Sequence, residues 1–264
     1  MKKKLILTLF LLVITNLIYS QKGIIYYGYI EAFTIGNAKG PDSNAFMTFD
    51  KNMSHYVTAK DSLEKADKIN EQKTYKKDED SGGAIHNGMK VSKEGDQVVY
   101  HIKKNTMWSN LLYGKQVYVK EVVDKINWKI SKDTKKIGKF NCKKATAKFR
   151  GRNYTAWFTT EIPVSFGPWK LHGLPGLILE AYDTNKNVYW YFKNIEYPTK
   201  NKETVKYLEI PKVEKFLTYS DFKKFQHNEQ ELVIEKSKIL QKKFPEVEMQ
   251  LEKPELSIMF IECE

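Results

Sequence analysis

The sequence is poor in the residues that build metal and redox centres, with two cysteines and five histidines among 264 residues. No two histidines lie at a ligand spacing such as H-x-x-x-H, and none has a close cysteine neighbour. Protein zinc sites usually take three or four such ligands. We therefore expect neither a metal site nor a cofactor. The histidines stand singly as His55, His86, His101, His172 and His227.

Motifs of familiar catalytic sites are also missing. The chain has no G-x-S-x-G nucleophile elbow and no glycine-rich phosphate loop. Two carboxylates beside strands, Glu161 and Glu180, have the chemistry for general acid and base work. The sequence does not bring them together, so we assign no catalytic residue and favour a protein that is not an enzyme.

Long apolar runs are absent except at the N-terminus, where one extends from Leu5 to about Thr15. Three lysines precede this run and the small residue Ser20 follows it, which is the order of a secretory signal peptide. We predict cleavage after Ser20 and a single β-rich domain over residues 21–264. A transmembrane helix needs roughly 20 apolar residues. We therefore expect no membrane span after cleavage, and an exported protein in the periplasm or associated with the outer membrane or cell surface.

Positive charge is what the chain has in excess. Its formal net charge is +12, which falls to +9 once Lys2, Lys3 and Lys4 leave with the signal peptide. Such a balance favours anionic partners, among them lipid head groups and acidic glycans. Solvated lysines on strands and turns are the simpler interpretation of most of this charge. We expect no nucleic-acid partner, because the chain is exported and carries no nucleic-acid motif.

The two cysteines, Cys142 and Cys263, leave two alternatives open. In an oxidising compartment they can form a disulfide that ties the C-terminal segment to a central strand. Closing so long a loop would stabilise the fold by about 4–5 kcal/mol in the chain-entropy model. The other alternative is two unpaired thiols. The sequence indicates no oligomeric state.

Runs of β-branched and aromatic residues, broken by short turns, predict antiparallel strands over most of the chain. Two hairpins are clearest, one pairing residues 140–149 with 154–162 and one pairing 177–183 with 188–197. Further strands are expected at 24–33, 43–50 and 55–59, and from Gln97 through 126–130. Residues 61–88 are charged and poor in apolar residues, which predicts a mobile loop near 73–90.

One amphipathic helix is predicted over residues 221–244, with Ser220 as its N-cap and Pro245 as its stop. The fold class we expect is mainly β, a curved antiparallel meander sheet or half-barrel with this C-terminal helix packed on one face. The apolar residues at helical spacing, which predict the buried stripe, are Phe222, Phe225, Leu232, Val233, Ile239 and Leu240.

The segment WKLHGLPGLILEAYD, residues 169–183, combines turn chemistry with a strand. Pro175 fits the first central position of a type II turn, and Gly176 would supply the positive φ of the second. Gly173 would let the backbone pass close to a neighbour. The apolar residues from Leu177 onward predict a strand buried on both faces.

The hexapeptide Gly173-Leu174-Pro175-Gly176-Leu177-Ile178 resembles the signature of the GLPGLI family of exported proteins from Gram-negative bacteria. The resemblance begins near residues 113–121 and ends near Asp183, so it covers about the central third of the chain strongly. It implies a signal peptide, export and a β-rich domain, and it implies no established activity. His172 lies beside the signature at a position to which the family assigns no role.

Aromatic residues are the best candidates for a binding surface. Residues Trp169 to His172 would lie on an exposed loop, and Trp157 and Trp190 lie on neighbouring strands; the other interpretation of these tryptophans is core. Our first hypothesis is a non-catalytic binder of a hydrophobic or anionic envelope ligand, such as a lipid or glycan. The second is an interaction module that docks on an outer-membrane protein, and the third is a carboxylate hydrolase. The candidate ligand-binding residues are Trp169, Lys170, His172, Trp157 and Trp190.

Overall fold

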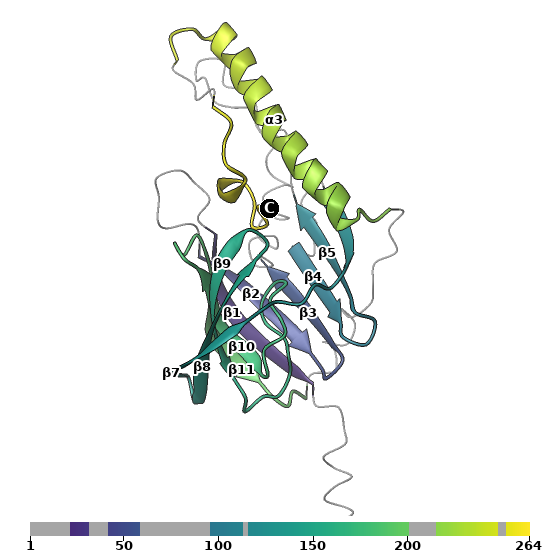
Figure 1. Cartoon of the computed structure of the whole chain (residues 1–264), viewed down its shortest axis with the longest axis vertical. Coiled ribbons are helices and arrows are strands. Elements are labelled where there is room, and N and C mark those ends of the chain that lie inside the picture. The colour runs from purple at the N-terminus through teal and green to yellow at the C-terminus, as the bar shows by residue number, and fades with distance from the viewer. Residues whose placement is uncertain (1–21, 32–41, 59–95, 113–115, 201–214, 248–251) are drawn as a thin grey trace, which may run out of the picture.

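The computed structural model describes residues 22–31, 42–58, 96–112, 116–200, 215–247 and 252–264. These residues contain eleven strands in one sheet, a long helix and a short 3-10 turn (Figure 1). All neighbouring strands pair antiparallel, so the predicted mainly β fold is confirmed. The predicted signal peptide and the predicted mobile loop near 73–90 lie outside the described residues.

The strands are β1 (Gly23–Glu31), β2 (Asp42–Phe49), β3 (Met53–Thr58), β4 (Asp96–His101), β5 (Thr106–Leu112), β6 (Gln116–Val122), β7 (Lys129–Ile137), β8 (Phe140–Phe149), β9 (Arg152–Thr159), β10 (Leu177–Asp183) and β11 (Val188–Glu196). The helix is α3 (Tyr219–Lys243) and the 3-10 turn is η2 (Leu256–Ile258). Both predicted hairpins are present, as β8–β9 and β10–β11.

The strand order explains why the sheet is curved. It runs β6-β5-β4-β3-β2-β1-β11-β10-β9-β8-β7, so two meanders join where the first strand pairs with the last. The edge strands β6 and β7 are consecutive in sequence and only residues 123–128 separate them. Eleven flat strands would span about 48 Å, whereas this link reaches about 25 Å at most. The sheet must therefore curl, which confirms the predicted curved sheet.

The link between β6 and β7 differs from its prediction. Residues 126–128 were expected to belong to a strand, but β7 begins only at Lys129. Ile126 is nevertheless buried in the core, and the indole nitrogen of Trp128 donates a hydrogen bond to the carbonyl of His172 at 2.7 Å. The apolar residues here belong to a connecting segment that packs on the core and not to a strand. Apolar periodicity alone does not distinguish these two cases.

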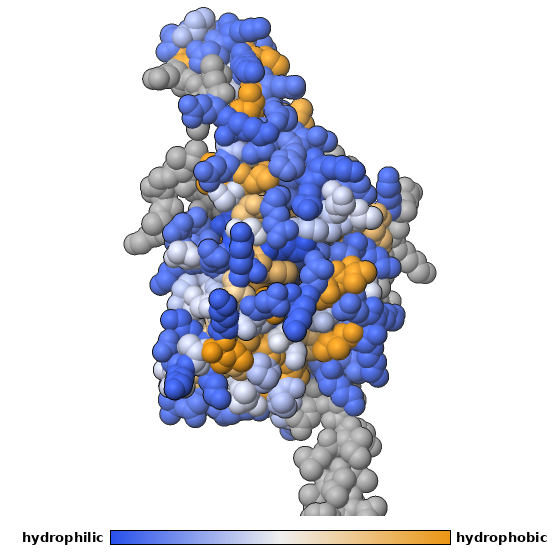
Figure 2. All heavy atoms as spheres, in the orientation of Figure 1, coloured by the Kyte–Doolittle hydropathy of each residue, from blue (hydrophilic) through white to orange (hydrophobic). Residues whose placement is uncertain are grey.

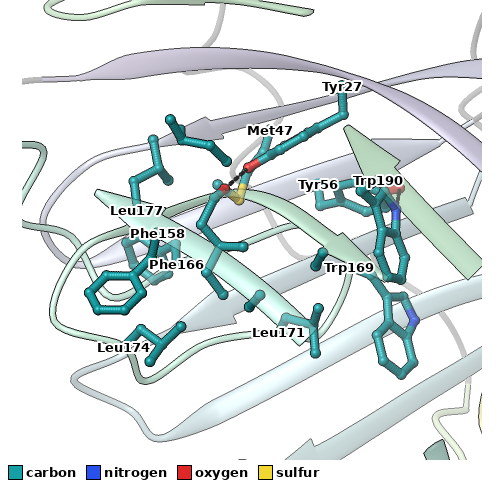
Figure 3. Close-up of a cluster of buried hydrophobic side chains, with 14 of the residues drawn as sticks. Tyr27, Met47, Tyr56, Phe158, Phe166, Trp169, Leu171, Leu174, Leu177 and Trp190 are labelled. Carbon is teal, nitrogen blue, oxygen red and sulfur yellow. Dashed lines mark hydrogen bonds between the residues drawn. The ribbon is translucent and has the colours of Figure 1, made fainter. Parts of the chain in front are cut away.

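The concave side of the sheet is filled by the loop between β9 and β10, residues 160–176. Its residues Phe166, Trp169, Leu171 and Leu174 are buried and pack in one cluster with strand residues such as Trp190 (Figure 3). The loop reaches the far half of the sheet, because the ring of Phe166 lies 5.7 Å from that of Tyr100 on β4. The GLPGLI segment is therefore part of the core.

Two polar groups within this core form hydrogen bonds across the sheet. The hydroxyl of Tyr27 on β1 donates to the carbonyl of Ile178 at 2.6 Å. The indole nitrogen of Trp190 donates to the hydroxyl of Tyr56 on β3 at 2.7 Å (Figure 3). Such pairs remove the cost of burying a polar atom and fix the register between the two halves of the sheet.

The two glycines of the motif exchange their predicted roles. Gly173, and not Gly176, has the positive φ, +88°. A Cβ on Gly176 would lie 2.1 Å from the carbonyl oxygen of Thr159, so this glycine permits the close backbone approach. The type II turn predicted around Pro175 and Gly176 is therefore wrong. Gly173 instead turns the chain where its amide donates to the carbonyl of Ser165 at 3.1 Å.

The predicted helix exists, but its N-cap is Thr218 rather than Ser220. The Thr218 hydroxyl accepts from the amide of Asp221 at 3.1 Å, and the helix ends before Pro245 as expected. The helix covers the β6 edge rather than a face of the sheet. Phe222 packs there against Val117 and Val119. Its far end projects away from the sheet (Figure 1).

The predicted apolar stripe of α3 is mostly exposed. Leu232, Val233, Ile239 and Leu240 are 40–54% exposed, and Phe222 is the one member of the predicted stripe that is buried. The helix buries a different row of residues at a spacing of four, namely Phe222, Gln226, Gln230 and Ile234. In Figure 2 the projecting end is predominantly hydrophilic, with separate small hydrophobic patches.

Candidate functional site

The five predicted ligand-binding residues are all buried. Trp190 and Lys170 are 0% and 1% exposed, and Trp169, His172 and Trp157 are 6–9% exposed. Trp169 was expected to lie open on a loop but stacks on Trp190, with ring centroids 6.1 Å apart. The exposure prediction is therefore wrong, because the Gly-Pro loop folds into the concave side of the sheet.

Lys170 forms the middle of a buried ionic centre that comprises Glu121, Arg150, Lys170 and Glu262. Its ammonium lies 2.6 Å from a carboxylate oxygen of Glu121 and 2.6 Å from one of Glu262. Arg150 pairs with Glu121 as well and lies 3.7 Å from Glu262. Two cations and two carboxylates thus compensate one another away from water, which such charges require.

Aromatic rings and strained backbone surround the ionic centre. The guanidinium of Arg150 lies 3.5 Å from the ring centroid of Tyr219, the first residue of α3. Arg150 and Trp169 both have positive φ, +51° and +54°. This conformation costs a residue with a side chain about 1–2 kcal/mol. The surrounding contacts therefore hold both residues in place.

Burial controls the protonation of the neighbouring groups. It raises the pKa of Glu262, an effect that the ammonium of Lys170 opposes. It lowers the pKa of His172, whose ring nitrogens lie 2.8 Å from the carbonyl of Lys170 and 3.1 Å from that of Asp124. His172 therefore links the loop to the segment after β6 as a structural residue.

The ionic centre and Arg152 together hold the C-terminal tail, residues 252–264. Arg152 donates to the carbonyls of Ile261 and Phe260, each at 2.9 Å, and to that of Ser257. Its guanidinium is held by Asp183 at 2.7 Å. Gln226 of α3 donates to the carbonyl of Glu262 at 2.7 Å. The tail is thus fixed between the sheet rim and the helix.

Sequence reasoning missed the ionic centre because charged residues in a basic chain are usually solvated. One signal was present in β6. Glu121 follows Val117 and Val119 at a spacing of two, so all three side chains lie on one face of the strand. A carboxylate in line with two buried valines indicates a buried cationic partner. Nothing in the local pattern indicates that this partner is Lys170.

Both cysteines are free thiols. Cys142 lies near the start of β8 and contacts the carbonyl of Phe140, whereas Cys263 contacts the carbonyl of Arg150 beyond the end of that strand. Eight residues of strand separate these positions, about 26 Å. The disulfide alternative is therefore incorrect. Burial raises the pKa of Cys142 to about 11, so its thiol is protonated at neutral pH.

The convex face of the sheet carries the accessible aromatic residues. Tyr182 on β10 and Tyr189 on β11 are directly opposed, and Tyr191 follows on the same face. The three rings are half-buried and lie in contact, with centroids 5.7 and 5.6 Å apart. We call these residues the tyrosine face. A Cβ on Gly28 would lie 2.0 Å from the ring of Tyr191, so this glycine provides space for the ring on β1.

Lysines lie over the tyrosine face. Lys186, in the turn between β10 and β11, has its ammonium 5.3 and 5.5 Å from the ring centroids of Tyr182 and Tyr189. Lys193 lies 5.5 Å from the ring centroid of Tyr191. These distances are within cation–π range. The arrangement combines partly exposed amphipathic rings with positive charge.

The candidate carboxylates Glu161 and Glu180 have separate structural partners. Glu161 accepts a hydrogen bond from the backbone amide of Asn141 at 2.8 Å. Glu180 pairs with Lys135 at 2.7 Å. Across the ranges that the structure describes, no three histidine, cysteine, aspartate or glutamate residues gather to hold a metal ion. In the same ranges no helix is long and apolar enough to cross a membrane.

Comparison with known proteins places the chain beside a family of unknown function. A family model described as "Protein of unknown function (Porph_ging)" matches residues 149–180, a segment that holds the whole Gly173–Ile178 motif. The match is consistent with the GLPGLI resemblance and with an exported protein. No curated protein matches the chain.

Two solved structures are similar in part. A structure of PNGF-II in space group P21 matches with a TM-score of 0.49 and 15% identity, covering 78% of this chain and 33% of that one. A structure of PNGF-II in space group C2 matches with a TM-score of 0.46 and 14% identity, covering 75% and 31%. The chain thus spans about a third of the length of these proteins.

Proposed function

We propose that the protein is a non-catalytic binder of a cell-envelope glycan, and that the glycan lies along the tyrosine face. The observation that carries the proposal is the row formed by Tyr182, Tyr189 and Tyr191, half-exposed and in mutual contact beneath Lys186 and Lys193. The concave residues named by the sequence are committed to the core and to the ionic centre, so they leave the convex face as the accessible aromatic surface.

Tyrosine rings suit a sugar ligand for a physical reason. One face of a sugar ring presents C–H groups that pack on an aromatic ring, while its hydroxyls stay hydrated. Tyrosine offers such an apolar body and keeps a polar hydroxyl at its tip. The three rings of the tyrosine face are partly exposed and lie in a row on the strands, so a long chain can contact several of them at once. A polymer is therefore favoured over a small enclosed molecule.

The proposal is tested with an array of bacterial envelope polysaccharides and purified oligosaccharides, followed by calorimetry on the best binder. The variant Tyr182→Ala/Tyr189→Ala should weaken binding at least about fivefold, because each lost ring contact contributes about 0.5–1.5 kcal/mol. Tyr182→Phe/Tyr189→Phe keeps the rings and should retain most of the affinity.

Tyr118→Ala provides the control, since Tyr118 is a half-buried tyrosine on β6, near the other edge of the sheet. Its affinity should equal that of the wild type. Absence of binding to every glycan on the array would contradict the proposal. So would an equal loss of affinity in the Tyr118 and Tyr182/Tyr189 variants.

A further inference from the structure

We propose, on the basis of the glycan-binding function, that the ligand is an acidic polysaccharide and that its charged groups bind a lysine edge beside the tyrosine face. The lysine edge lies on the β7–β8 hairpin and in the link that precedes it. It consists of the exposed residues Lys125, Lys129, Lys132, Lys136, Lys139, Lys143 and Lys148.

The charges in this segment are unbalanced. The acidic residues between 123 and 149 are Asp124 and Asp133. Asp124 lies 3.7 Å from Arg150, and Asp133 lies 3.3 Å from Lys144. Within the described part of the chain, neither acid therefore neutralises the lysine edge, and none of its seven lysines forms an ion pair. Seven like charges on one hairpin and the link before it repel one another, and a polyanion would relieve that repulsion.

Part of the lysine edge shares a face of the sheet with the tyrosine face. Tyr182 is opposite Thr155 on β9, and Thr155 is opposite Thr146 on β8. Thr146 is in turn opposite Lys129, and Lys148 follows Thr146 on the same face of β8.

In the sheet, β9 alone separates β8 from β10. Lys144 on β8 is opposite Trp157 on β9, and Lys135 of β7 lies 4.5 Å from the ring centroid of Trp157. The same Lys135 pairs with Glu180, two residues before Tyr182 on β10. Charged and aromatic side chains thus continue from one region to the other.

The length of the lysine edge favours a polymer as the ligand over a single acidic group. Lys139 and Lys148 stand nine residues apart along the hairpin, about 30 Å. This distance is several times the screening length of about 8 Å at physiological ionic strength, so a single acidic group would interact with only one or two of the lysines. A polysaccharide with an acid group on each repeat can interact with several of these lysines at once.

Lysines on an edge strand have a second use, because they prevent edge-to-edge pairing of sheets. The two roles give different results in one experiment. Calorimetry would compare oligogalacturonides with their fully methyl-esterified forms, which have the same sugar backbone without the charge. The wild type should bind the acidic oligomers at least tenfold more tightly, and this preference should decrease with added salt.

The variant Lys129→Gln/Lys148→Gln removes the two charges of the lysine edge that share a face with the tyrosine face. It should weaken binding of the acidic oligomer about fivefold, within the range expected for two exposed ion pairs, and leave binding of the ester unchanged. Lys236→Gln/Lys242→Gln removes the same charge from exposed positions of α3 and is the matched control. It should change the affinity less than twofold.

Three results would overturn the inference. They are equal affinity of the wild type for acid and ester, equal losses in the two lysine variants, and tighter binding of oligothymidylate than of the acidic oligomer. Failure of the glycan-binding function is recognised separately, because it would leave the wild type without a ligand on the polysaccharide array. Failure of the inference alone would leave binding that depends on Tyr182 and Tyr189 but not on charge.

Discussion

At the scale of single residues, the motif glycines show how one residue type serves two needs. Gly176 makes room for the Thr159 carbonyl. Gly173 supplies a positive φ, and a Cβ at this position would have its nearest neighbour, the indole nitrogen of Trp128, at 4.0 Å. A steric clash with backbone cannot be relieved by a side-chain rotation. Strain at a positive φ is smaller and depends on the residue that replaces glycine.

Substitution of these glycines should therefore give different costs. Gly173→Ala should lower the free energy of unfolding by about 1–2 kcal/mol, and Gly173→Asn should recover part of that loss, since asparagine tolerates positive φ. Gly176→Ala should cost more, about 3 kcal/mol, and Gly176→Asn should recover nothing. Urea denaturation of the four variants measures these values. A larger cost at Gly173 than at Gly176 would support the type II turn instead.

Lys170 is the residue on which the ionic centre depends. Replacing it by methionine leaves Glu121 and Glu262 buried with only Arg150 to compensate them. Breaking a buried pair in this way should lower the free energy of unfolding by about 3–5 kcal/mol at neutral pH. Urea denaturation measures this cost, and Lys170→Met/Glu262→Gln should recover part of it.

The pH dependence of the Lys170→Met cost follows from Glu262. Burial raises the pKa of Glu262 in the folded protein above its unfolded value. A carboxyl shifted this way favours folding below the unfolded pKa, and that contribution is lost as pH rises through the folded pKa. Without Lys170 the upward shift grows, so the cost should increase with rising pH. A cost independent of pH would contradict the assignment of Glu262.

At the scale of elements, the strands were predictable and the helix contacts were not. Alternation such as that of Tyr154, Ala156 and Phe158 marks a strand because only one side of the sheet reaches the core. For α3, apolar spacing predicted a buried stripe with Leu232 and Ile239, yet both are exposed. The helix uses Gln226 and Gln230 to bind carbonyls of the C-terminal tail. The spacing of apolar residues cannot predict a helix face that packs through polar side chains on the backbone of another segment.

For the candidate site, the sequence predicted that aromatic residues would form it but not which ones. The sequence identified Trp157, Trp169 and Trp190, which are buried in the structure, whereas the partly exposed rings are those of Tyr182, Tyr189 and Tyr191 on the convex side. That division depends on the pairing register and on where the β9–β10 loop folds. Both depend on contacts far apart in sequence, which periodicity does not contain.

At the scale of the whole molecule, the curved sheet has a packed concave side, which stabilises the fold, and a convex side, which carries the proposed binding surface. Its concave side is filled by the β9–β10 loop, the link 123–128 and, at the rim, the C-terminal tail. Its convex side keeps the tyrosine face, and the lysine edge lies at one border. The GLPGLI motif therefore contributes to stability, and the proposed binding surface is formed by the strands on either side of it.

Mapping of the bound glycan by NMR tests the central claim most directly. The isotope-labelled protein would be titrated with the best-binding oligosaccharide from the array, and amide and tyrosine ring shifts would be followed. The proposal predicts that the largest changes fall on Tyr182, Lys186, Tyr189 and Tyr191, with little change at Trp169 and Lys170. Changes centred on Trp169 and Lys170, with the tyrosine face unaffected, would contradict it.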